Sequence, residues 1–129
     1  MHVGFTGTQS GMSQKQLQQL RDLLSKYDNS DEFHHGDCIG ADSEAHDVAR
    51  GFSVCSCVYP PSNCKKRAYK KGQYTYTPKD YISRNHNIVN AVQLLIAAPR
   101  RNEEELRSGT WATIRYARKV NVPVIIMER

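Results

Sequence analysis

The chain has 129 residues, about the length of one domain, and 39% of them are apolar, which excludes a low-complexity or fully disordered protein. Its longest apolar runs, Leu94 to Pro99 and Val122 to Met127, are too short to cross a bilayer. No basic leader with a small-residue cleavage site follows Met1. We therefore expect a single cytoplasmic domain over residues 1–129, with no membrane partner.

The positive charge is concentrated in one segment. Lys and Arg number 18 against 13 Asp and Glu, which gives a net charge of +5. Residues 61–80 contain six of these cations and only one acid, Asp80, so they account for the whole excess. A local basic patch of this kind predicts contact with an anionic partner.

Strands and helices alternate through the first part of the chain. Ser13 and Gln16 form a capping box for one helix, and Asp42 is a good N-cap for a second helix that ends near Gly51. The expected strands around these helices are His2 to Thr6, Glu32 to His35 and Phe52 to Tyr59.

Two more helices and two more strands are expected after the basic segment. Thr77 can cap a helix that has Pro78 at its first position, and the Ser108-Gly109-Thr110 turn opens the last helix. The last two expected strands are Gln93 to Ala98 and Val122 to Met127. This alternation predicts an α/β fold: a doubly wound, mainly parallel five-stranded sheet with helices on both faces.

Cysteine and histidine are the residues to test for metal binding. The cysteines are Cys38, Cys55, Cys57 and Cys64, and the histidines nearest to them in sequence are His34, His35 and His46. Their spacing matches no standard zinc pattern, and without a secretory signal disulfides are not expected. The sequence therefore predicts reduced thiols, structural histidines, no metal and no cofactor.

Three glycine turns precede helices at the carboxyl ends of expected strands, where doubly wound sheets bind ligands. The turns are Gly4 to Thr8, Gly36 to Asp42, and Ser108 to Thr110. Each leads into a helix N-terminus, whose free amides and dipole favour phosphate. Three such turns in register predict a phosphorylated ligand, although each would also serve as a simple tight turn. None matches a dinucleotide fingerprint or a Walker loop.

Two further features each allow two interpretations. Either Arg84 reaches a phosphate and Asn85 shapes the pocket, or Arg84 is solvated and Asn85 binds loop backbone. The basic segment interleaves Tyr69, Tyr74 and Tyr76 with its cations, as surfaces for single-stranded nucleic acids do, but a solvated loop has the same composition. Its candidate nucleic-acid contacts are Lys65, Lys66, Arg67, Lys70 and Lys71.

Several of these motifs together resemble a known family. Gly36 to His46 is similar to the glycine, acid and Ala-His signature of DNA-processing protein A (DprA/Smf). Ser83 to Val89 looks like the Arg-Asn-x-x-Ile motif of the same proteins, and Ser108 to Thr113 resembles their Ser-Gly-[Ser/Thr]-x-x-Thr turn. With the opening Gly-Phe-Thr-Gly, the matches run in the right order over residues 4–127. The chain thus resembles the SLOG superfamily (Smf/DprA and LOG), most closely its small stand-alone YspA- or YpsA-like branch.

The resemblance implies a Rossmann-like nucleotide-binding fold and a homo-oligomer. The residues that would face the ligand are Gly7, Thr8, Gly36, Asp37, Gly40, Arg84, Asn85, Ser108, Gly109 and Thr110. LOG phosphoribohydrolases carry a Gly-Thr-x-x-Glu motif, and here Thr113 stands at the position of the family's catalytic glutamate.

Three functions follow as hypotheses. The first is binding of a nucleotide or nucleotide-derived ligand at the carboxyl ends of the strands. The second is an N-glycosidase acting on a nucleoside monophosphate, in which Arg84 holds phosphate and Asp37 or Glu44 assists departure of the base. The third is binding of single-stranded nucleic acid through the basic segment, as in DprA. Thr113 favours the first hypothesis over the second.

Overall fold

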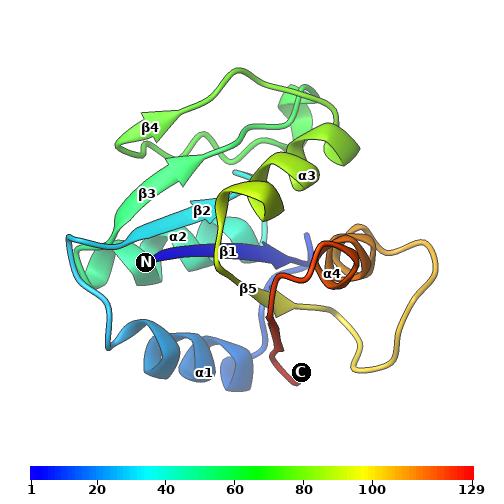
Figure 1. Cartoon of the computed structure of the whole chain (residues 1–129), viewed down its shortest axis with the longest axis horizontal. Helices are drawn as coiled ribbons and strands as arrows, with labels where there is room; N and C mark the ends of the chain where they lie inside the picture. The colour runs from blue at the N-terminus through cyan, green and yellow to red at the C-terminus, as the bar shows by residue number, and fades with distance from the viewer.

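All 129 residues are described by a computed structural model, in which six strands form one sheet and four helices cover it. The strands are β1 (His2–Gly7), β2 (Glu32–His35), β3 (Cys55–Val58), β4 (Tyr74–Thr75), β5 (Leu94–Ala98) and β6 (Val124–Ile126). The helices are α1 (Gln14–Leu24), α2 (Ala41–Gly51), α3 (Tyr81–Ala91) and α4 (Gly109–Lys119), with a short 3₁₀ turn at Cys64–Lys66. Every neighbouring pair of strands is parallel, in the order β4-β3-β2-β1-β5-β6 (Figure 1).

The sheet has one strand more than the sequence predicts. The sixth strand, β4, lies inside the basic segment, where Tyr74 pairs with Cys57 and Thr75 with Val58. Two residues are too few to show the alternating pattern of a strand. Tyr and Thr favour strands, but pairing with the edge of β3 determines that these two residues form one.

Two helices also begin differently from expectation. The N-cap of α3 is Asp80, whose side chain accepts from Ser83 N, so the helix starts three residues after Pro78. The N-cap of α2 is Gly40, with no side-chain cap. Asp42 therefore lies inside α2, and its carboxylate is free to bind elsewhere.

Helices α1 and α2 pack on one face of the sheet, and α3 and α4 on the other (Figure 1). The larger part of the core lies under α1 and α2, where Phe5 and Phe33 meet Leu20 and Leu24. On the opposite face, α3 and α4 contribute smaller clusters such as that around Trp111. Both faces of the sheet are thus buried, as a parallel sheet requires.

The strand order reverses beside β1. The chain runs outward from β1 through β2 and β3 to β4, then crosses over and places β5 on the other side of β1. The loops that leave β1 and β5 consequently diverge, which opens a crevice at the carboxyl ends of the strands. This is the position at which doubly wound sheets bind ligands.

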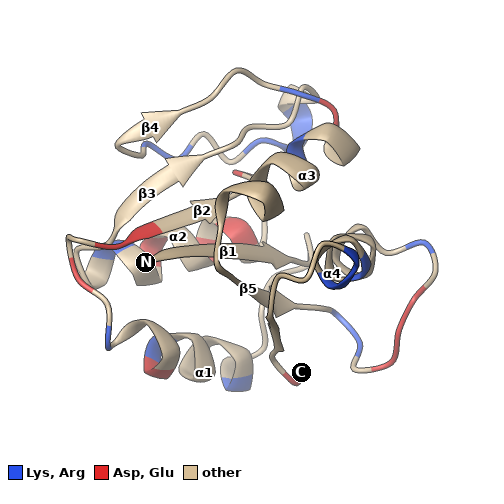
Figure 2. Ribbon diagram, in the orientation of Figure 1, with Lys and Arg blue, Asp and Glu red and all other residues tan.

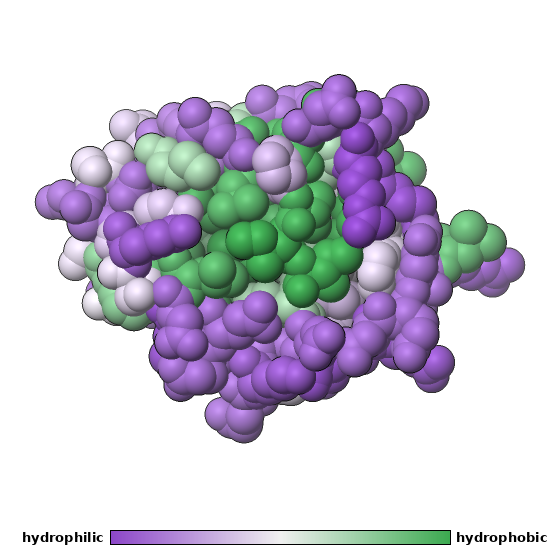
Figure 3. Space-filling model, turned by 60° about the horizontal axis from the view of Figure 1, so that its bottom comes forward, coloured by the Kyte–Doolittle hydropathy of each residue, from purple (hydrophilic) through white to green (hydrophobic).

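The other edge strand, β6, consists of three half-buried apolar residues and pairs with β5 alone. Figure 3 turns the bottom of the molecule forward and shows an apolar area there, surrounded by polar side chains. No helix is both long enough and apolar enough to cross a membrane.

Candidate functional site

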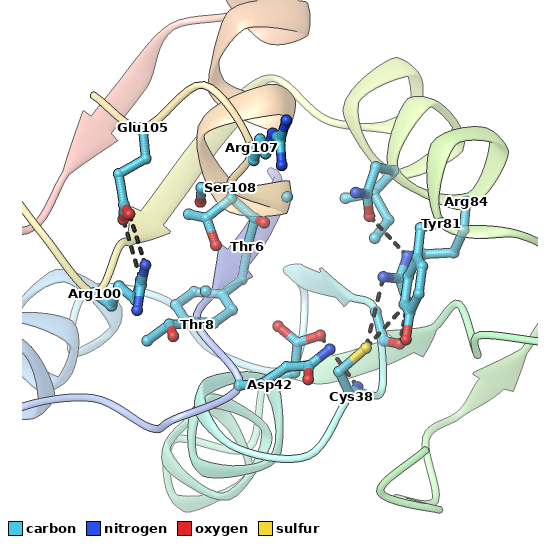
Figure 4. Close-up of a pocket in the computed structure, with 18 residues that line it drawn as sticks. Thr6, Thr8, Cys38, Asp42, Tyr81, Arg84, Arg100, Glu105, Arg107 and Ser108 are labelled. Carbon is cyan, nitrogen blue, oxygen red and sulfur yellow. Dashed lines mark hydrogen bonds and ion pairs between the residues drawn. The ribbon is translucent and has the colours of Figure 1, made fainter. Parts of the chain in front are cut away.

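A cavity of about 540 Å³ lies at the carboxyl ends of the strands (Figure 4). Its wall comes from the end of β1, the turn after β2, the first turns of α3 and α4, and the loop after β5. The predicted ligand residues that line it are Gly7, Thr8, Gly36, Arg84, Asn85, Ser108, Gly109 and Thr110. Segments more than 100 residues apart in sequence thus meet at one cavity.

The first turn of α4 forms one side of the cavity. The Ser108 hydroxyl accepts from Trp111 N at 3.2 Å and so caps the helix. The amides of Gly109 and Thr110 have no acceptor within the chain. Arg107, immediately before the cap, is exposed and forms no ion pair. Two free amides and an unpaired guanidinium make this corner of the cavity suitable for an anion.

Gly109 differs from the other glycines of the predicted site. A Cβ on Gly7 would collide with Ala41, and one on Gly36 would collide with the Arg84 guanidinium. Gly40 has a φ of +89°, which favours glycine. A Cβ on Gly109, by contrast, would meet nothing within 4 Å. Packing explains Gly7 and Gly36, and backbone conformation explains Gly40. Neither requires glycine at Gly109, which leaves the space beside the free amides open.

Arg84 links the ends of two strands. It is buried, and its Nη1 donates to the carbonyls of Gly36 and, at 3.2 Å, Tyr59. Its Nε donates to Asn85 Oδ1 at 2.8 Å. Arg84 is thus not solvated, and Asn85 orients it instead of binding loop backbone. The remaining nitrogen, Nη2, is within 3.6 Å of Cys38 Sγ only, which leaves it available to a ligand.

Asp42, which the sequence predicts as a helix cap, is a residue of the cavity wall. It is buried, and its Oδ2 accepts from Cys38 N at 3.2 Å. Burial raises the pKa of Asp42 to about 6, although the nearby Arg84 guanidinium acts in the opposite direction. A carboxyl group that titrates close to neutral pH therefore faces the cavity.

An aromatic ring and an ion pair that the sequence does not predict also line the cavity. The Tyr81 ring, at the start of α3, lies 5.3 Å from the Arg84 guanidinium. On the opposite side, Arg100 and Glu105 form a two-bonded ion pair at 2.8 and 3.2 Å (Figure 4). Tyr81 and Arg100 are exposed and Glu105 is half-buried, and their sequence context resembles ordinary surface, so no local signal marks them.

Three predicted site residues lie outside the cavity. Asp37 is fully buried and accepts from Arg67 Nε at 3.1 Å and Lys70 N at 2.9 Å, so it anchors the basic segment. Glu44 accepts from Met12 N at 2.7 Å and holds the turn before α1. Gly40 caps α2. The expected catalytic roles of Asp37 and Glu44 are therefore not supported by their positions.

Thr113, at the position of the LOG glutamate, also lies outside the cavity wall. Its hydroxyl donates to Gly109 O at 2.9 Å inside α4, and it does not line the cavity. The wall contains no carboxylate at this position. Asp42, from the opposite side, is the buried carboxyl group that the cavity offers instead.

The basic segment lies beside this site, between β3 and α3 (Figure 2). Arg67 pairs with Asp37, and Lys70 pairs with Asp47 at 3.0 Å. The cations without an ion pair are Lys65, Lys66, Lys71 and Lys79. Ile39 N donates to Lys66 O at 2.9 Å, so the segment is tied to the turn after β2. Part of its charge is thus structural, and four lysines remain for a partner.

No protein-family model and no curated protein sequence matches the chain. Solved structures do. The molybdenum cofactor binding protein from Rippkaea orientalis aligns with a TM-score of 0.74 at 19% identity, over 97% of this chain and 74% of that one. DprA from Streptococcus pneumoniae aligns with a TM-score of 0.73 at 17% identity, over 97% of this chain and 49% of DprA.

DprA from Helicobacter pylori, whose structure describes its single-stranded DNA binding mode, aligns with a TM-score of 0.67 at 17% identity. This alignment covers 98% of the present chain and 64% of that protein. The TM-scores show that the folds are alike, and at such low sequence identity the likeness concerns the fold alone. The chain therefore shares the Rossmann-like fold of the molybdenum cofactor binding protein and of DprA, the fold that the resemblance of its motifs implied.

Proposed function

We propose that the protein binds a nucleotide or nucleotide-derived molecule in the cavity, with a phosphate at the start of α4. The observation that carries this proposal is the pair of free amides at Gly109 and Thr110, beside an unpaired Arg107 and a glycine that packing does not require. A phosphate oxygen can accept from both amides while the guanidinium neutralises its charge.

The rest of the cavity suits the heterocyclic part of such a ligand. Its volume, about 540 Å³, is within the range of small-molecule sites. The exposed Tyr81 ring offers a face on which a base can stack. Arg84 Nη2 and the Asp42 carboxyl can fix polar groups of the sugar or base, because both residues line the cavity (Figure 4).

Analysis of the molecules that the protein retains tests this proposal. Wild type and Gly109→Val are purified in parallel under native conditions, and small molecules released by denaturation are identified by mass spectrometry. We expect a phosphorylated nucleoside or a related heterocycle from the wild type and much less from the variant. A released ligand that carries no phosphate would contradict the proposal.

A second candidate function is hydrolysis of the N-glycosidic bond of a nucleoside monophosphate, and Asp42 is the observation that favours it. In its protonated form Asp42 would donate the proton to the departing base as the bond to C1′ breaks. Water would then add to C1′ and release its proton, which restores the acid. A pKa of about 6 suits a group that must both hold and release a proton.

This second function is tested by incubating nucleoside monophosphates with wild type and Asp42→Asn and measuring free base. Hydrolysis by the wild type that Asp42→Asn reduces by about 100-fold or more would support it. Absence of free base with every common base would restrict the cavity to binding.

The third candidate, single-stranded nucleic acid binding, is supported by the unpaired Lys65, Lys66 and Lys71 and by the exposed Tyr69 and Tyr74. The likeness to two DprA structures points in the same direction. At the same time Arg67 and Lys70 are engaged within the chain, which reduces the charge available to a polyanion.

We also propose that the chain self-associates, as the SLOG resemblance implies, through the apolar edge strand β6. An exposed parallel edge with apolar side chains is a surface that a second copy can cover. Light scattering should give a mass above that of one chain, and Ile125→Lys should reduce it to the monomer. A wild type that stays monomeric at high concentration would contradict this.

A further inference from the structure

Three potential metal ligands meet at the amino ends of β1 and β2, at the opposite end of the sheet from the cavity. His2 is the first residue of β1, Glu32 is the first of β2, and His34 follows two positions later. The strand register pairs His2 with Glu32, and alternate residues of a strand share a face. The three side chains therefore point to the same side of the sheet, on which α3 packs and His34 meets Tyr59.

The three donor atoms are spaced as ligands of one small ion. His2 Nδ1 lies 3.1 Å from His34 Nε2, and each of these nitrogens lies 3.8 Å from Glu32 Oε1. The point about 2.1 Å from all three atoms lies in their plane, and this distance suits zinc–nitrogen and zinc–oxygen bonds of about 2.0–2.2 Å. Rotation of the partly exposed His2 and Glu32 side chains would give the tetrahedral arrangement that zinc prefers. No rearrangement of the strands is needed to reach this geometry.

The surroundings hold two of these ligands in place. His34 is buried, and its other ring nitrogen, Nδ1, is bonded to the Tyr59 hydroxyl at 2.9 Å. If Nδ1 carries the proton, Nε2 presents its lone pair to the centre. The Cys57 thiol donates to Glu32 Oε1 at 3.1 Å and so fixes the carboxylate. Partners of this kind typically orient the ligands of metal sites.

The site is also accessible. The side chains of His2 and Glu32 are 43% and 34% exposed, whereas that of His34 is 3% exposed. An ion can therefore enter from solvent, and water can occupy a fourth position. Two imidazoles with one carboxylate are a known zinc ligand set.

We propose that His2 Nδ1, His34 Nε2 and Glu32 Oε1 bind one Zn²⁺ ion at the amino end of the sheet. The two nitrogen ligands favour zinc over Ca²⁺ and Mg²⁺, which prefer oxygen, and zinc binds such sites more tightly than Fe²⁺ does. The ion would connect the first residues of two neighbouring strands. This inference is independent of the proposed nucleotide function.

Calorimetric titration of untagged protein with Zn²⁺ tests the proposal. We expect one ion per chain, with affinity reduced by about 100-fold or more in His2→Asn and in Glu32→Gln. Both residues are partly exposed, so these variants should fold, and Gln can still accept from Cys57. His86→Asn is the matched control, because His86 stacks on Tyr116 away from the cluster. It should bind zinc as the wild type does.

Thermal unfolding provides a second readout. Zinc binds the folded chain, so the wild-type unfolding midpoint should rise as Zn²⁺ is added, and the midpoints of His2→Asn and Glu32→Gln should not. If the wild type binds no zinc at micromolar concentrations, the proposal is overturned. Equal affinity in the wild type and both variants would overturn it as well, because the three residues would then form only a hydrogen-bonded cluster.

Discussion

The two ends of the sheet are built in different ways. At the carboxyl end, loops and helix starts from five parts of the chain surround a space large enough for an organic molecule. At the amino end, three side chains on two adjacent strands converge within 4 Å of one another, which leaves room only for an ion. Loops that diverge make a wide site, whereas strands in fixed register make a narrow one.

Substitutions in the carboxyl-end cavity can distinguish the residues that stabilise the fold from those that bind the ligand.

The largest effect is expected from Arg84→Ala. If Arg84 holds the ends of β2 and β3 together, its removal leaves the buried carbonyls of Gly36 and Tyr59 without a donor. We expect the free energy of unfolding to fall by about 3–4 kcal/mol. Urea denaturation measures this, with Arg107→Ala as the control that should change stability by less than about 0.5 kcal/mol. An unchanged midpoint for Arg84→Ala would make Arg84 a ligand residue only.

Asp42 predicts a pH-dependent stability. Because its pKa is raised to about 6 in the folded chain, that state binds more protons than the unfolded chain between about pH 4 and pH 6. Stability should therefore fall as the pH rises through this window, and Asp42→Asn should lack that loss. We expect the stability of Asp42→Asn relative to wild type to rise by about 2–3 kcal/mol from pH 4 to pH 7. Parallel profiles for the two proteins would show that Asp42 titrates normally.

A smaller effect, on affinity alone, is expected from Arg107→Gln. An unpaired, exposed guanidinium beside the helix start should contribute a charge-assisted contact to phosphate. Its loss should weaken nucleotide binding by about tenfold, or about 1.4 kcal/mol, with no change in unfolding. Calorimetry measures this, and Arg101→Gln, on the same loop but outside the cavity wall, is the control. An equal loss of nucleotide affinity in both variants would indicate long-range electrostatic attraction and no direct contact between Arg107 and the phosphate.

The smallest effect on mononucleotide binding is expected from changing Lys65, Lys66 and Lys71 to Gln, because none of them lines the cavity. Mononucleotide affinity should stay within about twofold. If the segment binds single strands, the salt dependence of oligonucleotide binding should flatten by about 0.7 in log–log slope for each phosphate that a lysine no longer neutralises.

Fluorescence anisotropy over a salt series measures the oligonucleotide arm of this test. A wild type that binds no oligonucleotide at moderate salt would remove the nucleic-acid hypothesis. If the triple variant also loses its affinity for the mononucleotide, the basic segment forms part of the nucleotide-binding cavity and is not a separate site.

Much of the fold could be predicted from the sequence, because helix starts and buried strands carry local signals. The capping box at Ser13 and the turn at Ser108 are both present as expected. The two-residue β4 could not be predicted, since pairing with the edge of β3 determines it. The same holds for Asp42. Its residue type is typical of a helix N-cap, but Gly40 is the N-cap of α2 and Asp42 lies in the first turn of the helix.

The carboxyl-end cavity and the proposed zinc site also differ in how far local sequence signals indicate them. The carboxyl-end cavity is indicated by glycine turns, which are local motifs, although the sequence could not show that Asp37 and Glu44 turn away from it. At the amino end, the spacing of the cysteines predicts no zinc site. The proposed ligands come from strands 30 residues apart, and only their register brings His2 and Glu32 together.

The central claim is that the start of α4 binds a phosphate, and a matched pair of ligands tests it most directly. Calorimetry compares a nucleoside monophosphate with the same nucleoside, each titrated into wild type and Gly109→Val. We predict that the phosphate improves wild-type affinity by about 10- to 100-fold and that this gain disappears in Gly109→Val, whose fold has open space for the side chain. An equal gain from the phosphate in both proteins would contradict the claim.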